Sequence, residues 1–236
     1  MYEQLNTILQ TNGLCKNYGR IAALDGLDLS IPAGKIVGLL GPNGSGKTTL
    51  IKMAAGLIRP TRGQITVCGA APGADTKALV SYLPDRSALY PWMTVEDILG
   101  FFGDFYADFD MSRARDMLSR LKVPLDGRFR SLSKGTQERV QLVLVMSRRA
   151  RLYLLDEPIG GVDPATRELI LDTIISNYNE DSTVLISTHL ITDVERVLDE
   201  FVFLQNGKLL MQGSADDVRT NQGLSLDQLF REVFKC

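Results

Sequence analysis

Residues 35–56 read KIVGLL-GPNGSGKT-TLIKMAAG. Residues 35–40, which are apolar after Lys35, predict a buried strand, and the glycines that follow predict a tight turn. A helix is expected from residues 47–55, with Gly56 placed to end it. The turn itself fits the pattern G-x-x-x-x-G-K-[ST], and its position between a strand and a helix predicts a phosphate-binding loop.

The residue types in this loop suit a bound phosphate. Glycines let the backbone curve so that its N–H groups point inward, and the helix that follows offers its positive N-terminus. Lys47 would reach the β- and γ-phosphates, and Thr48 would offer a hydroxyl to Mg²⁺. An ordinary Gly-rich turn is the alternative, and the flanking strand and helix argue against it. The predicted nucleotide-binding residues of this segment are Gly41, Pro42, Asn43, Gly44, Ser45, Gly46, Lys47, Thr48 and Thr49.

Strand and helix patterns alternate in the rest of the chain. Short apolar runs at 81–83, 152–155 and 184–187 predict three further buried strands, and residues 201–211 favour a closing hairpin. Residues 85–150 are rich in helical patterns and poor in strands. The expected architecture is an α/β sheet with a helical lobe inserted into it.

We treat the chain as a single domain of residues 1–236. The α/β core is expected at 1–84 and 151–212, the helical lobe at 85–150, and a helical tail at 213–236. Inside the lobe, Thr94 and Asp97 have the spacing of a capping box, which marks the start of a helix.

Two carboxylates, Asp156 and Glu157, follow the apolar run 152–155. Beside a phosphate loop, the first could hold Mg²⁺ and the second could orient or deprotonate an attacking water. Without the loop, the same pattern would fit a solvated strand end equally well.

His189 is the only histidine in the chain and follows the predicted strand 184–187. A lone histidine is more often a surface or core residue than a functional one. Predicted strands end immediately before Gly41, Pro84, Asp156 and Thr188. Ligands of parallel sheets bind outside the carboxyl ends of the strands, so the loop, Asp85, the acidic pair and His189 would share one rim.

The composition argues against two classes of protein. Lys plus Arg total 26 and Asp plus Glu total 28, so the net charge of −2 gives no sign of a nucleic-acid partner. Apolar runs such as 142–146 are far shorter than the roughly 18 residues of a membrane span, so a membrane role would need a partner. Cys15, Cys68 and Cys236 are far apart, which favours a reducing cytosol.

Residues 132–139 read LSKGTQER and resemble the signature of the ATP-binding cassette family, usually written LSGGQ. The family pattern continues as DEPIGGVDP at 156–164 and as STH at 187–189, and KNYG at 16–19 resembles its aromatic adenine-binding loop. The resemblance extends from about residue 14 to residue 213 and is to the separate nucleotide-binding subunit of a transporter.

The resemblance implies roles for several of the matching residues. Tyr18 would stack on adenine, although core packing is the alternative for any tyrosine. Glu157 would be the catalytic carboxylate, His189 would contact the γ-phosphate, and Asp163 would lie in the loop that links two sites. Two cassettes, identical or different, would pair head to tail. The signature residues that would then contact the partner's nucleotide are Leu132, Ser133, Lys134, Gly135 and Thr136.

The resemblance also implies a fold and an activity. The fold would be a P-loop NTPase core with a mainly parallel sheet, an antiparallel β subdomain and an inserted helical lobe. The chain would hydrolyse ATP with Mg²⁺, on the cytoplasmic, inner face of the cell membrane, and move separate permease subunits, with export preferred. The alternative is a soluble cassette ATPase that acts on DNA or ribosomes, which usually shows basic patches or long coiled-coil insertions.

The segment 90–94 resembles the region of the family that meets the membrane subunit. Its aromatic residues, and those that follow at helical spacing, could instead form the core of the lobe. We expect a mixture, in which the phenylalanines are buried and Tyr90 or Trp92 lies nearer the contact.

Three positions depart from the family pattern. Lys134 replaces a glycine and Thr136 a glutamine, while Ser133 and Gly135 are kept. Asp85 stands where the family usually has glutamine. A carboxylate there could bind Mg²⁺, or it could point to solvent or cap the next helix.

Overall fold

The computed structural model describes residues 6–178 and 181–234. The first five residues of the expected domain and Cys236 therefore lie outside the described residues. The strands are β1 Thr7–Tyr18, β2 Ile21–Pro32, β3 Ile36–Leu40, β4 Arg62–Val67, β5 Val80–Leu83, β6 Leu152–Asp156, β7 Thr183–Thr188, β8 Glu200–Gln205 and β9 Lys208–Ser214. The α-helices are α1 Lys47–Ala54, α2 Ala74–Leu79, α3 Val95–Phe105, α4 Met111–Arg120, α5 Lys134–Met146, α6 Pro164–Asn177, α7 Ile191–Val194, α8 Ala215–Asp217 and α9 Leu226–Phe234. Three short helical segments of other pitch are η1 Phe129–Ser131, η2 Glu195–Val197 and η3 Val218–Gln222.

The larger sheet has six strands in the order β5-β6-β7-β3-β8-β9. Its first five strands are parallel, and β9 returns antiparallel to β8 as the expected hairpin. Every residue of β3, β6 and β7 is buried, as continuous apolar strands are when both faces of a parallel sheet are covered. Leu40 pairs with Thr188 and Asp156 with Ser187, so these three strands end at one level.

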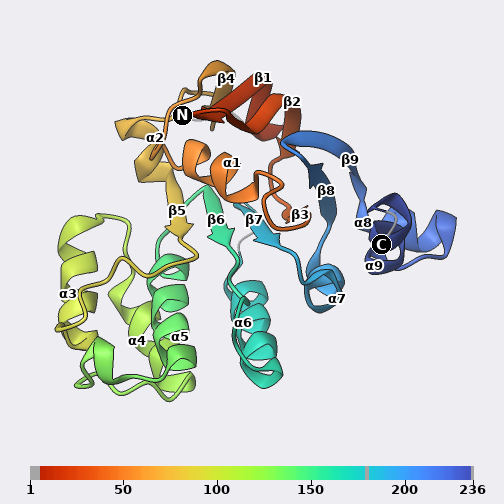
Figure 1. The fold of residues 1–236 in the computed structure, drawn as a ribbon. Helices are drawn as coiled ribbons and strands as arrows, with labels where there is room; N and C mark the ends of the chain where they lie inside the picture. The colour runs from red at the N-terminus through yellow and green to blue at the C-terminus, as the bar shows by residue number, and fades with distance from the viewer. Residues whose placement is uncertain (1–5, 179–180, 235–236) are drawn as a thin grey trace.

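A smaller antiparallel sheet, β2-β1-β4, lies on the far side of α1 from the larger sheet (Figure 1). Helix α1 packs into the hydrophobic cluster that joins the two sheets, with Leu50, Ile51 and Met53 fully buried. The phosphate loop is thereby held between two rigid layers. The predicted combination of a mainly parallel sheet and an antiparallel subdomain is confirmed.

Helices α3, α4 and α5 form the lobe expected between β5 and β6, at the lower left of Figure 1. The predicted capping box is confirmed. Thr94 Oγ1 accepts a hydrogen bond from the Asp97 N–H at 3.1 Å, and Asp97 Oδ2 accepts one from the Thr94 N–H at 2.9 Å. Helix α3 therefore begins where the sequence predicts.

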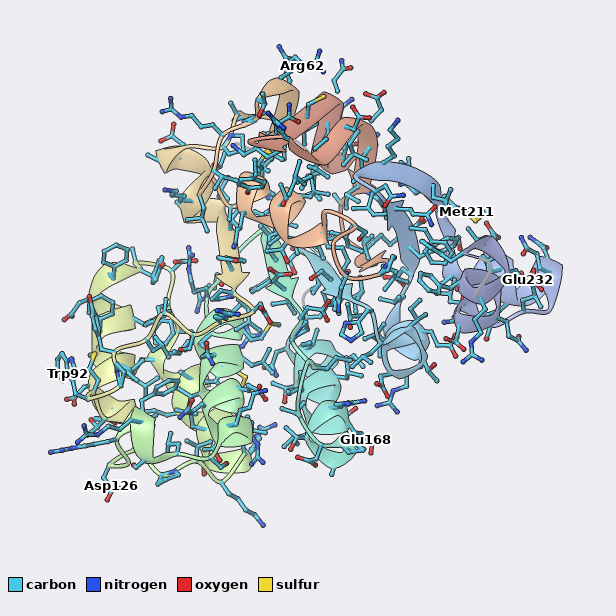
Figure 2. The ribbon with its side chains drawn as sticks, in the orientation of Figure 1. Arg62, Trp92, Asp126, Glu168, Met211 and Glu232 are labelled. Atoms are coloured by element: carbon cyan, nitrogen blue, oxygen red, sulfur yellow. The ribbon has the colours of Figure 1, made fainter. Side chains whose placement is uncertain are left out.

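The expectation that the phenylalanines of this lobe are buried is wrong for two of them. Phe101 is 46% exposed and Phe105 is 68% exposed, and their rings stack with centroids 5.9 Å apart. Helix α3 buries Ile98 and Leu99 instead, so Phe101 and Phe105 lie on its outer face. Trp92, 63% exposed, also lies on the outside of the lobe (Figure 2).

Arg148 joins the end of α5 to the beginning of β5. Its side chain is only 4% exposed, and its guanidinium donates to Asp108 Oδ1 at 3.0 Å. It also donates to the carbonyls of Val80 at 2.7 Å and Ala78 at 3.1 Å, and it lies 4.0 Å from the ring centroid of Tyr106. The lobe is thus anchored to the sheet at the C-terminal end of α5, whereas residues 132–135 lie at the N-terminal end of that helix.

Replacing Arg148 by methionine is expected to lower the free energy of unfolding by about 3 kcal/mol. Removing one partner of a buried ion pair leaves the other groups without donors, and such changes cost roughly 3–5 kcal/mol. The matched control is Arg120→Met, because Arg120 pairs with Asp116 on the surface of α4 and exposed pairs contribute about 0–1 kcal/mol. Urea unfolding checks both, and equal stability of the two variants would contradict the anchoring role.

The last strand and the C-terminal helices lie at the opposite side of the molecule from the lobe (Figure 1). Strand β9 runs to Ser214, so it overlaps the start of the tail expected at residue 213. Helix α9 packs Phe230 against Phe203 of β8, with ring centroids 5.3 Å apart. In the described part of the chain, no helix is both long enough and apolar enough to cross a bilayer.

Candidate nucleotide site

The phosphate loop takes a shape that its glycines allow. Gly44 and Gly46 have φ angles of 82° and 107°, in the left-handed region that other residues rarely occupy. A Cβ at Gly46 would lie 2.6 Å from the carbonyl oxygen of Ala23, so a side chain there would also clash. Glycine at position 46 is therefore required both by the backbone angle and by the close approach of β2.

Lys47, the first residue of α1, is buried and reaches back into the loop. Its Nζ donates to the carbonyl of Gly41 at 2.8 Å and to that of Pro42 at 3.2 Å. It also lies 3.6 Å from Glu157 Oε1. Burial lowers the pKa of Lys47, and the neighbouring Glu157 opposes that shift. The ammonium is thus held on the curve of the loop, where a phosphate would meet it.

Asp156, at the end of β6, is buried, and only one of its two carboxylate oxygens accepts hydrogen bonds. Its Oδ1 accepts hydrogen bonds from the Thr48 hydroxyl at 3.1 Å and from the Ser187 hydroxyl at 2.6 Å. Its Oδ2 is buried and has no hydrogen-bond partner among the described residues. Burial raises the pKa of Asp156, since a carboxylate is costly to keep charged without compensation.

The free carboxylate oxygen and the Thr48 hydroxyl fit a magnesium ion. Mg²⁺ prefers oxygen ligands and commonly takes one or two from the protein while a substrate's phosphates supply others. Within the described residues, no cluster of three or more His, Cys, Asp or Glu side chains is arranged to hold a metal without such help.

Glu157 lies between the lysine of the loop and the only histidine. Its Oε2 lies 3.1 Å from Nδ1 of His189, and its Oε1 faces Lys47. Its φ angle is 52°, an uncommon value for a residue with a side chain and one often found at functional sites. A hydrogen bond of 3.0 Å from its N–H to the Ser187 carbonyl holds this conformation. A carboxylate in this position is chemically able to act as a proton acceptor.

A cavity of about 690 Å³ opens over the loop. The predicted site residues that line it are Tyr18, Asn43, Gly44, Ser45, Gly46, Lys47, Thr48, Thr49, Asp85, Lys134, Glu157 and His189. The lining of this cavity does not include Gly41, Pro42 or Asp156. The carbonyls of Gly41 and Pro42 accept hydrogen bonds from the lining residue Lys47, and Asp156 accepts one from the lining residue Thr48. The other lining residues are Ile21, Ala22, Ala23, Gly160 and Gly161.

Ser187 is the main residue of the site to which the sequence assigned no role. It is fully buried at the end of β7, bonds Asp156 through its hydroxyl, and accepts from the Glu157 N–H through its carbonyl. It thereby holds both carboxylate residues in place. The sequence feature that could have identified Ser187 is its hydroxyl at the end of the otherwise apolar run 184–187.

Of the signature residues, Lys134 alone lines the cavity of its own chain among the residues described. Ser133 caps α5, with its Oγ accepting from the Thr136 N–H at 3.2 Å. Asp163 caps α6 in the same way, accepting from the Thr166 N–H at 3.1 Å, and these hydrogen bonds lower the pKa of Asp163. Both residues thus fix helix starts, and their contacts with a second nucleotide stay predictions.

Asp85 lies in the connection that follows β5, exposed at the rim of the cavity. Its charge contributes to raising the pKa of Asp156, which places it close to the acidic pair. Burial, with a smaller contribution from Asp156 and Asp85, raises the pKa of Tyr82 to about 12. The alternative that Asp85 caps the next helix is wrong, because Thr94 caps α3.

Comparison with known proteins gives consistent results. A family model described as ABC transporter matches residues 24–160. The uncharacterized ABC transporter ATP-binding protein YhaQ of Bacillus subtilis (strain 168) is 32% identical over 221 residues, which is 92% of this chain and 74% of that protein. The Nod factor export ATP-binding protein I of Ralstonia nicotianae (strain ATCC BAA-1114 / GMI1000) is 34% identical over 91% of this chain and 70% of that protein. A solved structure, described as that of an ATP binding subunit of an ABC transporter, matches with a TM-score of 0.85 and 31% identity, covering 97% of this chain and all of that one.

Proposed function

The chain belongs to the ABC transporter family of ATP-binding proteins, and we propose that it hydrolyses ATP to drive transport through separate membrane-spanning subunits. The observation that carries the proposal is the position of the Glu157 carboxylate. It lies 3.6 Å from Lys47 and 3.1 Å from His189, within the cavity over the phosphate loop. This arrangement combines phosphate binding with a base for an attacking water.

The side chains have separate tasks in the proposed reaction. The N–H groups of the loop and Lys47 bind the phosphates, and Tyr18, at the exposed edge of the cavity, stacks on the adenine. Glu157 accepts a proton from the water that attacks the γ-phosphorus. The bond from that phosphorus to the bridging oxygen breaks, and ADP and inorganic phosphate are released. His189, beside Glu157, contacts the γ-phosphate.

Thr48 and Asp156 are the residues that would hold Mg²⁺. The free Oδ2 of Asp156 supports this assignment, since a bound cation would offset the burial of the carboxylate. The ion would partly neutralise the phosphate charge.

A second cassette, identical or related, would complete the site. Ser133 and Gly135 cap and begin α5 but are not among the described lining residues of their own cavity. They can therefore serve a nucleotide only if another chain presents one, as the family resemblance implies. Asp163 would then lie in the loop between the two sites, and hydrolysis would reopen the pair.

The outer face of the lobe is the proposed contact with the membrane subunits. The exposed aromatic side chains there are Tyr90, Trp92, Phe101 and Phe105. Aromatic residues gathered on a surface are typical of protein interfaces. The chain would sit on the cytoplasmic face of the membrane as one domain, with core, lobe and tail as divided above, and without nucleic acid. Similarity to a Nod factor export protein favours export.

Purification of the tagged chain from detergent-solubilised membranes tests the proposal. We expect Mg²⁺-dependent ATP hydrolysis and co-purification with proteins that mass spectrometry identifies as membrane-spanning. Co-purification with ribosomes or DNA, sensitive to nuclease, would favour the alternative function instead. Absence of ATP binding by the purified chain would overturn the proposal.

Replacing Asp85 by glutamine is expected to alter how the metal affects ATP binding. With Mg²⁺ in excess the affinity for ATP should change by less than about twofold, because the cation balances the added carboxylate. With a chelator, ATP should bind about threefold to tenfold more tightly, because a like charge near the phosphates is removed. Titration of both proteins with and without Mg²⁺ checks this. The control is Asp126→Asn, in the lobe. If the wild type, Asp85→Gln and Asp126→Asn show the same effect of Mg²⁺ on ATP affinity, Asp85 lies outside the site.

A further inference from the structure

Tyr18 is the last residue of β1 and stands at the tip of the hairpin that β1 forms with β2. It pairs with Ile21 across a two-residue turn, so its backbone is fixed by the hairpin. The side chain has much less support, because the ring is 48% exposed where it lines the nucleotide cavity. A ring in such a place needs a further contact if it is to present one face to a flat ligand.

Lys16 provides that contact. Residues two apart on a strand point to the same face of the sheet, and the Lys16 Nζ lies over the Tyr18 ring, 5.4 Å from its centroid. A cation at this distance is attracted by the negative face of an aromatic ring. Tyr18 lines the nucleotide cavity, whereas Lys16 is not among its described lining residues. The ammonium therefore occupies the side of the ring away from the cavity, and the other face is left for a ligand.

The ammonium of Lys16 is itself held in place by the connection between α1 and β4. Its Nζ donates to the carbonyl of Arg59, in that connection, at 2.7 Å. In the same connection, the Thr61 hydroxyl accepts from the N–H of Asn17 at 3.0 Å, and the Thr61 N–H donates to the carbonyl of Cys15 at 2.8 Å. The residues just before Tyr18 are thus tied to the chain that continues from the helix of the phosphate loop.

Two roles for Lys16 are compatible with these contacts. A bracing role would need only the hydrogen bond to the Arg59 carbonyl. The position of the ammonium over the ring adds a second role, because a ring that is already ordered loses less freedom when a ligand stacks on it. Ordering a mobile side chain on binding weakens affinity by roughly twofold to tenfold. A cation that orders Tyr18 beforehand removes part of that loss.

We propose that Lys16 is a positioning residue for base recognition, which holds the Tyr18 ring with one face toward the cavity, where the adenine of ATP stacks. This inference rests on the proposed function, which assigns adenine to Tyr18. Lys16 itself touches no part of the nucleotide. Its effect therefore falls on the contact with the base, whereas the contacts with the phosphates, made by the loop and Lys47, are unaffected.

The test measures dissociation constants, with Mg²⁺, for the non-hydrolysable analogue β,γ-imido-ATP and for inorganic tripolyphosphate, which has the phosphates but no base. The variants are Lys16→Met, Lys16→Arg, Tyr18→Ala and the double variant Lys16→Met with Tyr18→Ala. The matched control is Lys77→Met, which removes the same charge from an exposed position on α2 that does not line the cavity. Circular dichroism shows whether each variant keeps the fold.

We expect Lys16→Met to weaken binding of the ATP analogue about threefold to fivefold, the size of one cation–π contact at an exposed site. Binding of tripolyphosphate should change less than about twofold. Lys16→Arg should stay within about twofold of the wild type for both ligands, because a guanidinium also lies well over a ring. The control should match the wild type.

The double variant separates positioning of the ring from any other use of Lys16. Tyr18→Ala should weaken the ATP analogue about tenfold, since it removes the stacking contact with the base. In that background Lys16→Met should cause no further loss, because the ring through which it acts is absent. An equal loss in both backgrounds would overturn the inference.

Lys16→Met would also contradict the inference if it bound both ligands as the wild type does, or weakened both by the same factor. In these cases, weaker binding of the ATP analogue by Tyr18→Ala leaves the adenine contact and the proposed function intact. Unchanged binding by Tyr18→Ala would remove that contact, and the inference with it. A wild-type protein that binds no ATP analogue would overturn the proposed function itself.

Discussion

Replacing Lys47 by alanine is expected to raise the dissociation constant for ATP by about 100-fold or more. The ammonium of Lys47 lies on the curve of the phosphate loop and is held there by the carbonyls of Gly41 and Pro42. Charge-assisted hydrogen bonds contribute roughly 1.5–3 kcal/mol each, and about 1.4 kcal/mol corresponds to a tenfold change in affinity. Losing contacts to two phosphates therefore predicts the size of the effect.

Direct titration with ATP in the presence of Mg²⁺ measures this loss. Lys52→Ala is the matched control, since Lys52 belongs to the same helix and is not among the lining residues of the nucleotide cavity. Circular dichroism of each variant shows whether the fold is retained. A folded Lys47→Ala protein with the affinity of the wild type would remove Lys47 from the nucleotide site.

Replacing Glu157 by glutamine is expected to lower the rate of ATP hydrolysis by at least about 100-fold while ATP binding is preserved. The amide has the size of the carboxylate but cannot accept a proton, and a general base contributes roughly 10²–10⁴-fold to such rates. Glutamine can still donate to or accept from the groups that now surround Glu157, which include Lys47 and His189. The unhydrolysed ATP should then hold two chains together.

Turnover assays and size-exclusion chromatography with Mg-ATP check both parts of this expectation. Glu168→Gln is the control, because Glu168 lies on the exposed surface of α6, where it pairs with Arg196 at 3.4 Å (Figure 2). Wild-type turnover with no added dimer in Glu157→Gln would assign the base to another group. The fold-change in rate, measured at saturating ATP, separates a loss of chemistry from a loss of binding.

The phosphate loop was the easiest part to predict because its conformation is local. The left-handed angles of Gly44 and Gly46 and the start of α1 at Lys47 follow from residues that are neighbours in the chain. The capping box of Thr94 and Asp97 is local in the same sense. Short-range signals of this kind do not depend on how the rest of the chain packs.

The burial of the lobe's aromatic residues could not be predicted in the same way. Phe101 and Phe105 have the spacing of a buried helix face, yet α3 turns Ile98 and Leu99 inward instead. Helical periodicity identifies which residues share a face. It does not say which of two apolar faces meets the rest of the lobe, because that depends on the packing of α4 and α5.

The sequence by itself determined the family, the alternation of strands and helices, and the position of the phosphate-loop motif, because each depends on contiguous stretches of residues. Only the tertiary structure decided how distant residues meet. The order β6-β7-β3 brings Glu157 to Lys47 and His189, and buries Ser187 against Asp156. The folding of the lobe onto the sheet brings Lys134 to Gly161. Such contacts join residues far apart in the chain, and their geometry follows from strand order and helix packing, which no local pattern specifies.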